Sequence, residues 1–342
     1  MVTPIEQRYI DLHPGSAQLY ASAKGLFPDG VTHDGRRLNP FPIYATHGLR
    51  ARKWDVDGNQ LIDFWTGHGS MILGHAHPDI VETVAGQISK GTHLSASSEL
   101  EIRWAQWVQK LIPCAEKVRF HSSGTEANMM ALRMARAYTG KTKVVKFGNH
   151  FHGWHDYAMA GEQGIGGIPE ETLNTMIVLQ PNDIAKVESV FKEDNDIAAV
   201  ILEPTGGHMG EDPITPAFLG EIREVTERYG IVLIFDEVVT GFRISKNGAQ
   251  GLYGIIPDMT TLAKILGGGL PGGAVCGKAD IINMIEVSDG TEAGESRRVG
   301  HWGTFNANPL TASAGVKALE LVATTPVNDT ANAMATRLKN GL

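Results

Sequence analysis

The feature that most constrains the fold is residues 231–237 (IVLIFDE), where five apolar residues lead into two acids. A short apolar run rich in β-branched residues predicts a strand that is buried on both faces of a mainly parallel sheet. Open α/β sheets bind ligands at the carboxyl ends of their strands, which is where Asp236 lies. A buried carboxylate is costly unless a cationic group meets it, so we expect Asp236 to face a positive partner.

A second apolar run, residues 259–264, ends in Lys264 and leads directly into the glycine-rich residues 267–273. This run predicts another strand of the same sheet. Because parallel strands end at the same edge, we expect Asp236 and Lys264 to hold opposite ends of one small ligand.

The composition excludes several classes of protein. The chain has 342 residues, 42% of them hydrophobic, and a net charge of −8, which leaves no basic footprint for nucleic acid. Cys114 and Cys276 are the only cysteines, so a disulfide framework is excluded. The N-terminus lacks the pattern of a secretory signal, and no apolar run is long enough to span a bilayer. We therefore expect a cytoplasmic enzyme.

The rest of the chain alternates between predicted strands and helices, which indicates a wound α/β domain with a largely parallel sheet. Strands are predicted near 118–121, 143–147, 175–180, 197–203, 231–236, 259–264 and 272–276. Helices are predicted at 5–25, 78–89, 97–112, 127–138, 183–192, 216–229 and 308–323. Residues 50–65 predict a hairpin with its turn at Asp57-Gly58, which we favour over a calcium loop because further oxygen ligands are missing.

Residues 122–126 (SSGTE) stand between a predicted strand and a predicted helix. Free backbone N–H groups at such a helix start, together with the helix dipole, are suited to a phosphate. The same residues also fit an ordinary capping box, and the pattern alone leaves both readings open.

Two alternative functions are disfavoured by the residues themselves. Residues 272–278 resemble a P-loop, but Ala279 stands where Ser or Thr must bind magnesium, so nucleotide hydrolysis is not expected. The histidines of residues 150–156 (HFHGWHD) suggest a metal site, but Trp154 occupies the place where a binuclear site needs an acid. We therefore expect no metal there.

Together these features meet the demands of one cofactor, pyridoxal 5′-phosphate (PLP). Its ring nitrogen stays protonated beside a buried aspartate, its phosphate needs a helix start, and its ring needs a wall on each face. Its aldehyde needs a lysine whose neutral amine is accessible.

With these motifs in view, the chain resembles the class III, fold type I PLP-dependent aminotransferases, within the glutamate-1-semialdehyde 2,1-aminomutase branch. The resemblance runs from about residue 15 to the end. It implies that Phe151 and His152 form the stacking motif, with Phe151 where many relatives have Tyr, and that Glu203 supports the aspartate network. The residues that resemble the family's phosphate turn are Ser123, Gly124 and Thr125.

The same resemblance assigns the reactive end of the cofactor. It implies that Asp236 bonds the ring nitrogen, that Val238 forms the second ring wall, and that Lys264 is the Schiff-base lysine. Thr304 falls in the segment that one subunit offers to the phosphate of its neighbour, so a homodimer is expected.

The resemblance also implies a domain organisation. We expect residues 1–65 to form an N-terminal segment and small-domain hairpin, and residues 66–310 a large PLP-binding domain. Residues 311–342 are expected to form a helix leading into a C-terminal lobe that the chain lacks.

The expected activity is transfer of an amino group from an amino acid or amine to a keto acid, with Lys264 and Asp236 as the catalytic residues. Arg36 aligns with the position that binds the substrate carboxylate in the aminomutases. His68 and His208 replace a Trp and an Asn of the aminomutase pattern at substrate positions, which slightly favours a transaminase. The aminomutase reaction and a non-catalytic PLP-fold domain stay open as alternatives.

Overall fold

The computed structural model describes residues 2–287 and 297–342. It divides into two compact units, Met1–Val81 and Glu82–Leu342, which are described separately. Within the described residues, no helix combines the length and the hydrophobicity needed to cross a bilayer. The division into parts 1–65, 66–310 and 311–342 stays a prediction.

The first unit contains short helices and a three-stranded antiparallel sheet of order β1-β2-β3. Its elements are α1 (Pro4–Leu12), α2 (Pro14–Ala23), β1 (Ala45–Leu49), β2 (Arg52–Asp55), β3 (Gln60–Ile62) and α3 (Thr66–Gly69). The single helix predicted over 5–25 is wrong, because Pro14 starts a new helix and His13 takes a non-helical conformation. The predicted hairpin is present as β2 and β3.

The acids near the hairpin turn bind backbone groups. Asp55 accepts from the N–H of Asn59 at 2.8 Å and pairs with His13 at 2.7 Å. Asp57 accepts from the N–H of Gly15 at 2.6 Å. These bonds connect the hairpin to the junction of α1 and α2, which is a structural use of the carboxylates.

The second unit is built on a seven-stranded sheet of order β4-β11-β10-β9-β7-β5-β6. Its strands are β4 (Lys117–His121), β5 (Lys143–Phe147), β6 (Met176–Leu179), β7 (Ile197–Leu202), β9 (Val232–Asp236), β10 (Met259–Ala263) and β11 (Gly273–Gly277). Strands β10, β9, β7, β5 and β6 are parallel, and β11 runs antiparallel to both its neighbours. The predicted α/β class with a mainly parallel sheet is confirmed. Of the P-loop-like glycines, Gly273 and Gly277 lie in strand β11 and Gly272 directly precedes it, so they do not form a loop before a helix.

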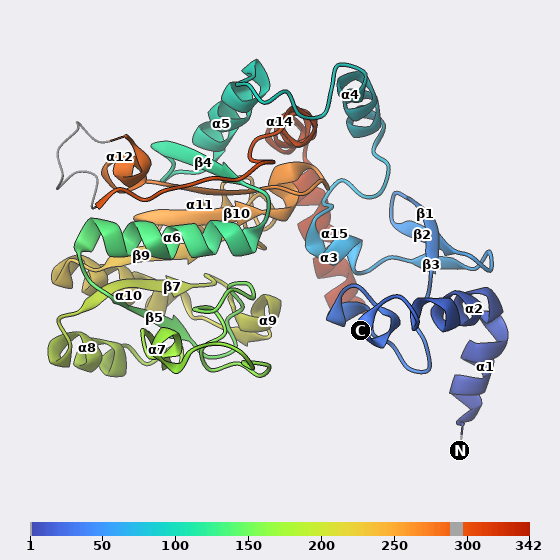
Figure 1. Cartoon of the computed structure of the whole chain (residues 1–342), viewed down its shortest axis with the longest axis horizontal. Helices are drawn as coiled ribbons and strands as arrows, with labels where there is room; N and C mark the ends of the chain where they lie inside the picture. Colours follow the sequence, from blue (N-terminus) through green and yellow to red (C-terminus); the bar gives the residue numbers. More distant parts are fainter. Residues whose placement is uncertain (1, 288–296) are drawn as a thin grey trace. The chain divides into compact units, whose positions relative to one another are not determined.

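Helices follow most strands (Figure 1). From residue 78 onward they are α4 (Pro78–Ile88), α5 (Glu99–Leu111), α6 (Gly124–Thr139), α7 (Glu170–Leu173), α8 (Ile184–Glu193), α9 (Gly207–Gly210), α10 (Pro216–Tyr229), α11 (Gly248–Tyr253), α12 (Ala279–Ile282), α14 (Pro309–Thr324) and α15 (Val327–Gly341). The short strand β8 (Asp212–Pro213) and the 3-10 turn η3 (Lys264–Gly267) complete the elements used below.

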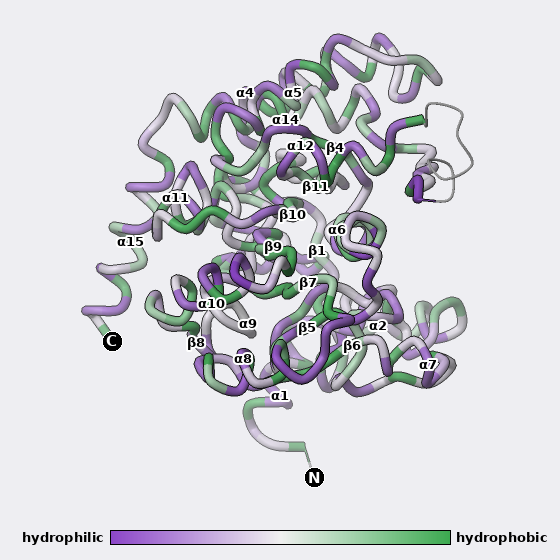
Figure 2. Tube along the Cα trace, turned by 90° about the vertical axis from the view of Figure 1, so that its left-hand side faces the viewer, coloured by the Kyte–Doolittle hydropathy of each residue, from purple (hydrophilic) through white to green (hydrophobic). Residues whose placement is uncertain are grey.

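The alternation of side chains along β9 determines which face each residue serves. Val232 and Ile234 pack with α6 residues such as Met130, whereas Leu233 and Phe235 pack with helices α8 and α10 on the other face. Figure 2 shows the hydrophobic colouring along the central strands. By the same period, Asp236 points to the α6 face, at the carboxyl end of the sheet.

We expect Leu233→Ala to lower the free energy of unfolding by about 2–5 kcal/mol, because it opens a cavity in a close-packed core. Leu233 is fully buried, whereas Leu252 is 54% exposed, so Leu252→Ala is the matched control. Chemical denaturation of the apoprotein measures both changes. Equal losses in the two variants would contradict this account of the core.

Candidate functional site

The candidate site lies where β9 and β10 end. The two strands are parallel neighbours, and Thr261 of β10 stands opposite Asp236 of β9. Lys264 follows Thr261 by three residues and opens the turn η3 just beyond the strand. The register therefore brings the two residues singled out in the sequence to the same edge of the sheet.

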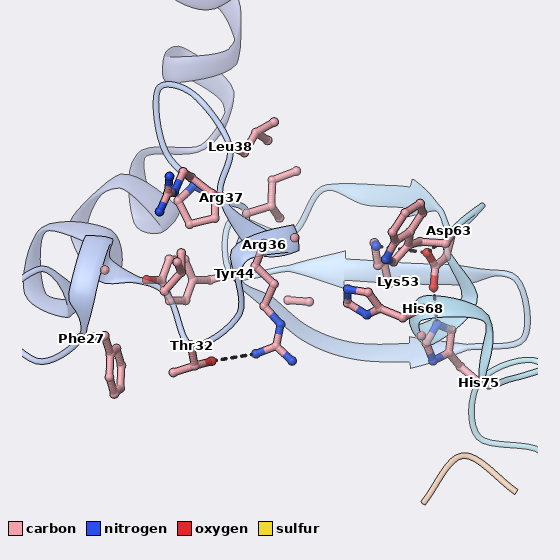
Figure 3. Close-up of a pocket in the computed structure, with 18 residues that line it drawn as sticks. Phe27, Thr32, Arg36, Arg37, Leu38, Tyr44, Lys53, Asp63, His68 and His75 are labelled. Carbon is pink, nitrogen blue, oxygen red and sulfur yellow. Dashed lines mark hydrogen bonds and ion pairs between the residues drawn. The ribbon is translucent and has the colours of Figure 1, made fainter. Parts of the chain in front are cut away.

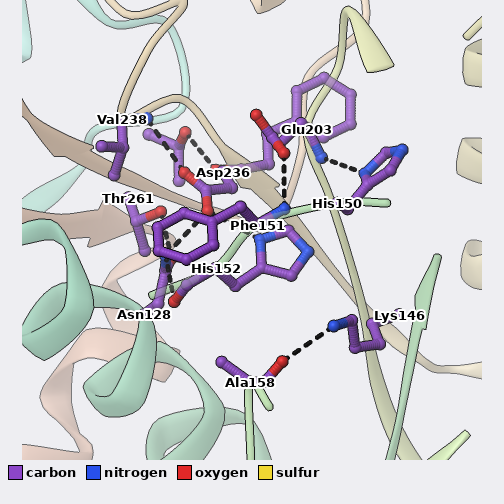
Figure 4. Close-up of polar contacts among 12 residues, drawn as sticks. Asn128, Lys146, His150, Phe151, His152, Ala158, Glu203, Asp236, Val238 and Thr261 are labelled. Atoms are coloured by element: carbon purple, nitrogen blue, oxygen red, sulfur yellow. Dashed lines mark hydrogen bonds and ion pairs between the residues drawn. The ribbon is translucent and has the colours of Figure 1, made fainter. Parts of the chain in front are cut away.

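Asp236 is 3% exposed and is held by donors from three parts of the chain. Its Oδ2 accepts from Asn128 Nδ2 at 2.7 Å and bonds His152 Nδ1 at 2.7 Å, and its Oδ1 accepts from the N–H of Val238 at 3.0 Å (Figure 4). These donors compensate for the burial of the carboxylate. Among the described residues, Oδ2 has two hydrogen-bond partners and Oδ1 has one, so Oδ1 is the less occupied oxygen.

Lys264 lies in an environment that disfavours its charge. Burial lowers the pKa of its amine, although the carboxylates of Asp236 and Glu203 oppose the shift. Its backbone has a φ of 52°, in the left-handed region that few residues with a side chain adopt. The turn is anchored by Trp104, whose Nε1 donates to the carbonyl of Leu266 at 3.0 Å.

Glu203 follows strand β7 and is 7% exposed. Its Oε1 accepts from the N–H of Phe151 at 2.7 Å, which connects it to the predicted stacking motif. Burial, and then the nearby Asp236, raises the pKa of the Glu203 carboxyl to about 8. At neutral pH this group is therefore mostly uncharged.

The predicted phosphate turn is the start of α6. Ser123 is the N-cap and accepts from the N–H of Glu126 at 3.2 Å, and Glu126 in turn accepts from the N–H of Ser122 at 2.6 Å. The capping arrangement therefore exists. Among the described residues, no hydrogen bond uses the N–H groups of Gly124 and Thr125, so these donors are available to an anion as well.

Close approaches at two glycines bring the predicted cofactor residues together. A Cβ on Gly124 would meet the side chain of Val238 at 2.9 Å and that of Ala263 at 3.4 Å. A Cβ on Gly153 would meet Oγ1 of Thr125 at 2.5 Å. The phosphate turn therefore lies beside the proposed ring wall, the residue before Lys264 and the loop that carries Phe151.

In the loop after β5, Phe151 is exposed to solvent, whereas His150, His152 and His155 are buried. Phe151 is 64% exposed, as a residue offering a ring face to a ligand should be, whereas His152 is buried against Asp236. His150 accepts from the N–H of Glu203 at 2.9 Å and His155 accepts from the N–H of Ala158. These contacts give the histidines separate structural partners.

Two predicted substrate residues line one cavity within the first unit. Arg36 and His68 both border a space of about 640 Å³ (Figure 3). Arg36 donates to Oγ1 of Thr32 at 2.9 Å, and the ring of His68 lies 4.9 Å from that of His33. His208 lies in α9, and its side chain falls outside the described part of the structure.

Thr304 lies on an exposed segment of the second unit. Its carbonyl bonds Nε2 of His93, and a cavity of about 290 Å³ adjoins both residues. Trp302 and Phe305 beside it are 88% and 61% exposed.

Two members of the site were missed by the sequence reasoning. Asn128 bonds Asp236 directly, and Thr261 donates to Oδ1 of Asn128 at 2.6 Å. A signal existed, because both are polar residues within segments that are otherwise apolar on the same face. Their partners lie in distant parts of the sequence, so the pattern did not show what they bind.

Comparisons with known proteins agree with this geometry. The model of the family "Aminotransferase class-III" matches residues 35–342. The chain is 43% identical over 327 residues to a glutamate-1-semialdehyde 2,1-aminomutase from Sulfurisphaera tokodaii, covering 93% of this chain and 76% of the relative.

Two solved transaminases are similar in structure. An ω-transaminase from Sphaerobacter thermophilus matches with a TM-score of 0.85 and 37% identity, over 91% of this chain and 74% of that one. A β-phenylalanine aminotransferase from Variovorax paradoxus matches with a TM-score of 0.84 and 32% identity, over 97% of this chain and 74% of that one. The chain belongs to the class III aminotransferases, a family of PLP-dependent enzymes of fold type I.

Proposed function

We propose that this protein is an aminotransferase that moves an amino group from an amino acid or amine to a keto acid. The observation that carries the proposal is the pairing of a buried carboxylate, Asp236, with a lysine of lowered pKa, Lys264, at adjacent strand ends. The free N–H groups at the start of α6 supply the third requirement, an anion site on the same face of the sheet.

The residues present fit PLP. Oδ1 of Asp236 would bond the ring nitrogen, and Phe151 and Val238 would face the two sides of the ring. The phosphate would be held by the hydroxyl of Ser123 and the N–H groups of Gly124 and Thr125. When bound, PLP supplies an electron sink for the carbon that carries the amine.

The side chains then have distinct tasks. Lys264, with its lowered pKa, is suited to take a proton from the substrate carbon and to return it later. Asp236 keeps the proton on the ring nitrogen, so that negative charge is drawn away from the reacting carbon. Glu203, largely neutral at pH 7, avoids a second negative charge beside Asp236.

For the substrate, Arg36 is proposed to bind a carboxylate, with His68 and His208 as further substrate residues. The second candidate is the aminomutase reaction, in which nitrogen moves within one molecule. The name of the Sulfurisphaera relative favours it, whereas the histidines at positions 68 and 208 favour transfer between molecules. The third alternative, a non-catalytic PLP-fold domain, predicts cofactor binding without turnover.

We further propose a cytoplasmic homodimer in which Thr304 reaches the phosphate of the neighbouring site. The exposed aromatic side chains of Trp302 and Phe305, on the same segment, support the dimer because apolar surface of this kind is suited to a second copy.

Lys264→Ala should abolish covalent capture of the cofactor. Borohydride treatment of the PLP-loaded protein is expected to fix the cofactor on Lys264, and intact-mass analysis measures the added mass. The variant should show no added mass, and its turnover should fall by about 10²–10⁴-fold, because the proton carrier is lost. The exposed Lys246→Ala is the control. Equal labelling of Lys264→Ala and the control would contradict the assignment.

Amino-donor assays separate transfer from rearrangement. We expect the PLP-loaded protein to convert pyruvate or 2-oxoglutarate into the matching amino acid when an amino donor is added, as chromatography can measure. Rearrangement of glutamate 1-semialdehyde without any keto acid would instead support the aminomutase. Cofactor labelling at Lys264 with neither reaction would support the non-catalytic alternative.

The raised pKa of Glu203 predicts a pH dependence of stability. The folded state holds a proton on Glu203 up to about pH 8, whereas an unfolded glutamate loses it near its model value of 4.5. The folded state therefore binds more protons in this window, and its stability falls as pH rises. Relative to Glu203→Gln, which mimics the neutral group, the wild-type apoprotein should lose free energy of unfolding between pH 5 and pH 8. If the free energies of unfolding of the wild type and Glu203→Gln, measured by chemical denaturation, change with pH in the same way, the raised pKa of Glu203 is refuted.

A further inference from the structure

Asn128 is a buried polar residue to which the proposed reaction assigns no task. It lies in α6, four residues after Gly124, and is 2% exposed. Its position places it directly behind the proposed phosphate turn. A buried amide of this kind is retained at low cost only if its donors and acceptor are satisfied.

Three hydrogen bonds connect Asn128 to three separate segments (Figure 4). Its Nδ2 donates to Oδ2 of Asp236 at 2.7 Å and to the carbonyl of His152 at 3.1 Å. Its Oδ1 accepts from the hydroxyl of Thr261 at 2.6 Å. One side chain therefore joins α6 to the strand of Asp236, the strand that leads to Lys264, and the loop of Phe151.

The acceptor groups around Asn128 determine which way its amide points, and Thr261 completes the arrangement. An asparagine amide presents an oxygen on one side and an NH2 group on the other, and only the NH2 group can bond a carboxylate. Oδ2 of Asp236 and the carbonyl of His152 can only accept hydrogen bonds, so the NH2 group must face them. The amide oxygen is then left facing the Thr261 hydroxyl, which donates to it. Asn128 and His152 both bond Oδ2 of Asp236, so Oδ1, which accepts from the N–H of Val238, is the oxygen left for a further donor.

We propose that Asn128 is a positioning residue, supported by a hydrogen bond from Thr261, that holds the carboxylate of Asp236 so that Oδ1 keeps the cofactor's ring nitrogen protonated. This inference rests on the proposed function, since it assumes that Asp236 meets that nitrogen. The competing account is that Asn128 serves only to fill and satisfy the core, in which case its loss would reduce stability alone.

Strand β10 offers a matched pair of variants. Thr260 and Thr261 are neighbours, both fully buried, and each donates one hydrogen bond. Thr261 bonds Asn128, whereas Thr260 donates to the carbonyl of Phe235 at 2.7 Å and not to the amide. Thr261→Val and Thr260→Val therefore remove comparable hydroxyl groups, and only the first disturbs the amide.

The experiment measures the cofactor directly. Wild type, Thr260→Val, Thr261→Val, Asn128→Leu and the double variant Asn128→Leu/Thr261→Val are loaded with PLP carrying ¹⁵N in the ring. The ¹⁵N chemical shift measures protonation of the ring nitrogen, titration of apoprotein with PLP measures the dissociation constant, and denaturation of apoprotein measures stability. The double variant removes both bonding partners at once, so it leaves no unpaired Thr261 hydroxyl and should be more stable than Asn128→Leu.

We expect wild type and Thr260→Val to show a protonated ring nitrogen. Asn128→Leu and the double variant should move the ¹⁵N resonance toward the unprotonated form and raise the dissociation constant for PLP by about tenfold to a hundredfold, the range for loss of a hydrogen bond to a charged group. Thr261→Val should give a smaller shift in the same direction, because the amide keeps its two acceptors but loses the bond that supports its oxygen. If the double variant is more stable than Asn128→Leu but its ¹⁵N resonance stays shifted from that of the wild type, the positioning role is established.

The inference is overturned if both Asn128 variants, or Thr261→Val where the Asn128 variants do not fold, keep the wild-type resonance and dissociation constant while stability falls. An unprotonated ring nitrogen in the wild type would instead refute the proposed role of Asp236. The two failures therefore give different results.

Discussion

The burial of one carboxylate at the end of the central strand is the constraint on which the site depends. Asp236 is almost fully buried, and a buried charge must find compensating partners within the protein. Its donors come from α6, from the loop after β5 and from its own backbone two residues on. Because these segments meet at a single group, a shift in any one of them changes the carboxylate that the others also hold. The packing of these segments therefore determines how the Asp236 carboxylate is held.

Burial shifts the pKa values of two further ionisable groups near Asp236, one downward and one upward. Burial lowers the pKa of Lys264 and raises that of Glu203, so both groups are driven toward their neutral forms. A neutral amine is a base and a nucleophile, whereas a neutral carboxyl adds no charge beside Asp236. Asp236 has three hydrogen-bond partners and Glu203 accepts one bond, so Asp236 is the carboxyl whose charged form the protein supports better.

The start of α6 shows how one structural device serves two purposes. Ser123 and Glu126 satisfy some of the N–H groups that a helix leaves unpaired, and this stabilises the helix without any ligand. The N–H groups of Gly124 and Thr125 remain for an anion. Close packing of Gly124 against Val238 then sets this turn beside the proposed ring wall, which a residue with a side chain would push away.

The sequence alone determined the strands of the main sheet, its fold class and the roles expected of Asp236 and Lys264, because buried strands are local apolar runs and chemistry follows from residue type. Strand β1, Ala45–Leu49, was not predicted, since it is largely exposed and lacks an apolar alternation. Asn128 and Thr261 could not be paired from the sequence either. They are separated by 133 positions, and only the parallel register of β9 and β10 beneath α6 brings them to one carboxylate. Tertiary structure decided these contacts, because hydrogen bonds between distant segments depend on how the sheet is assembled.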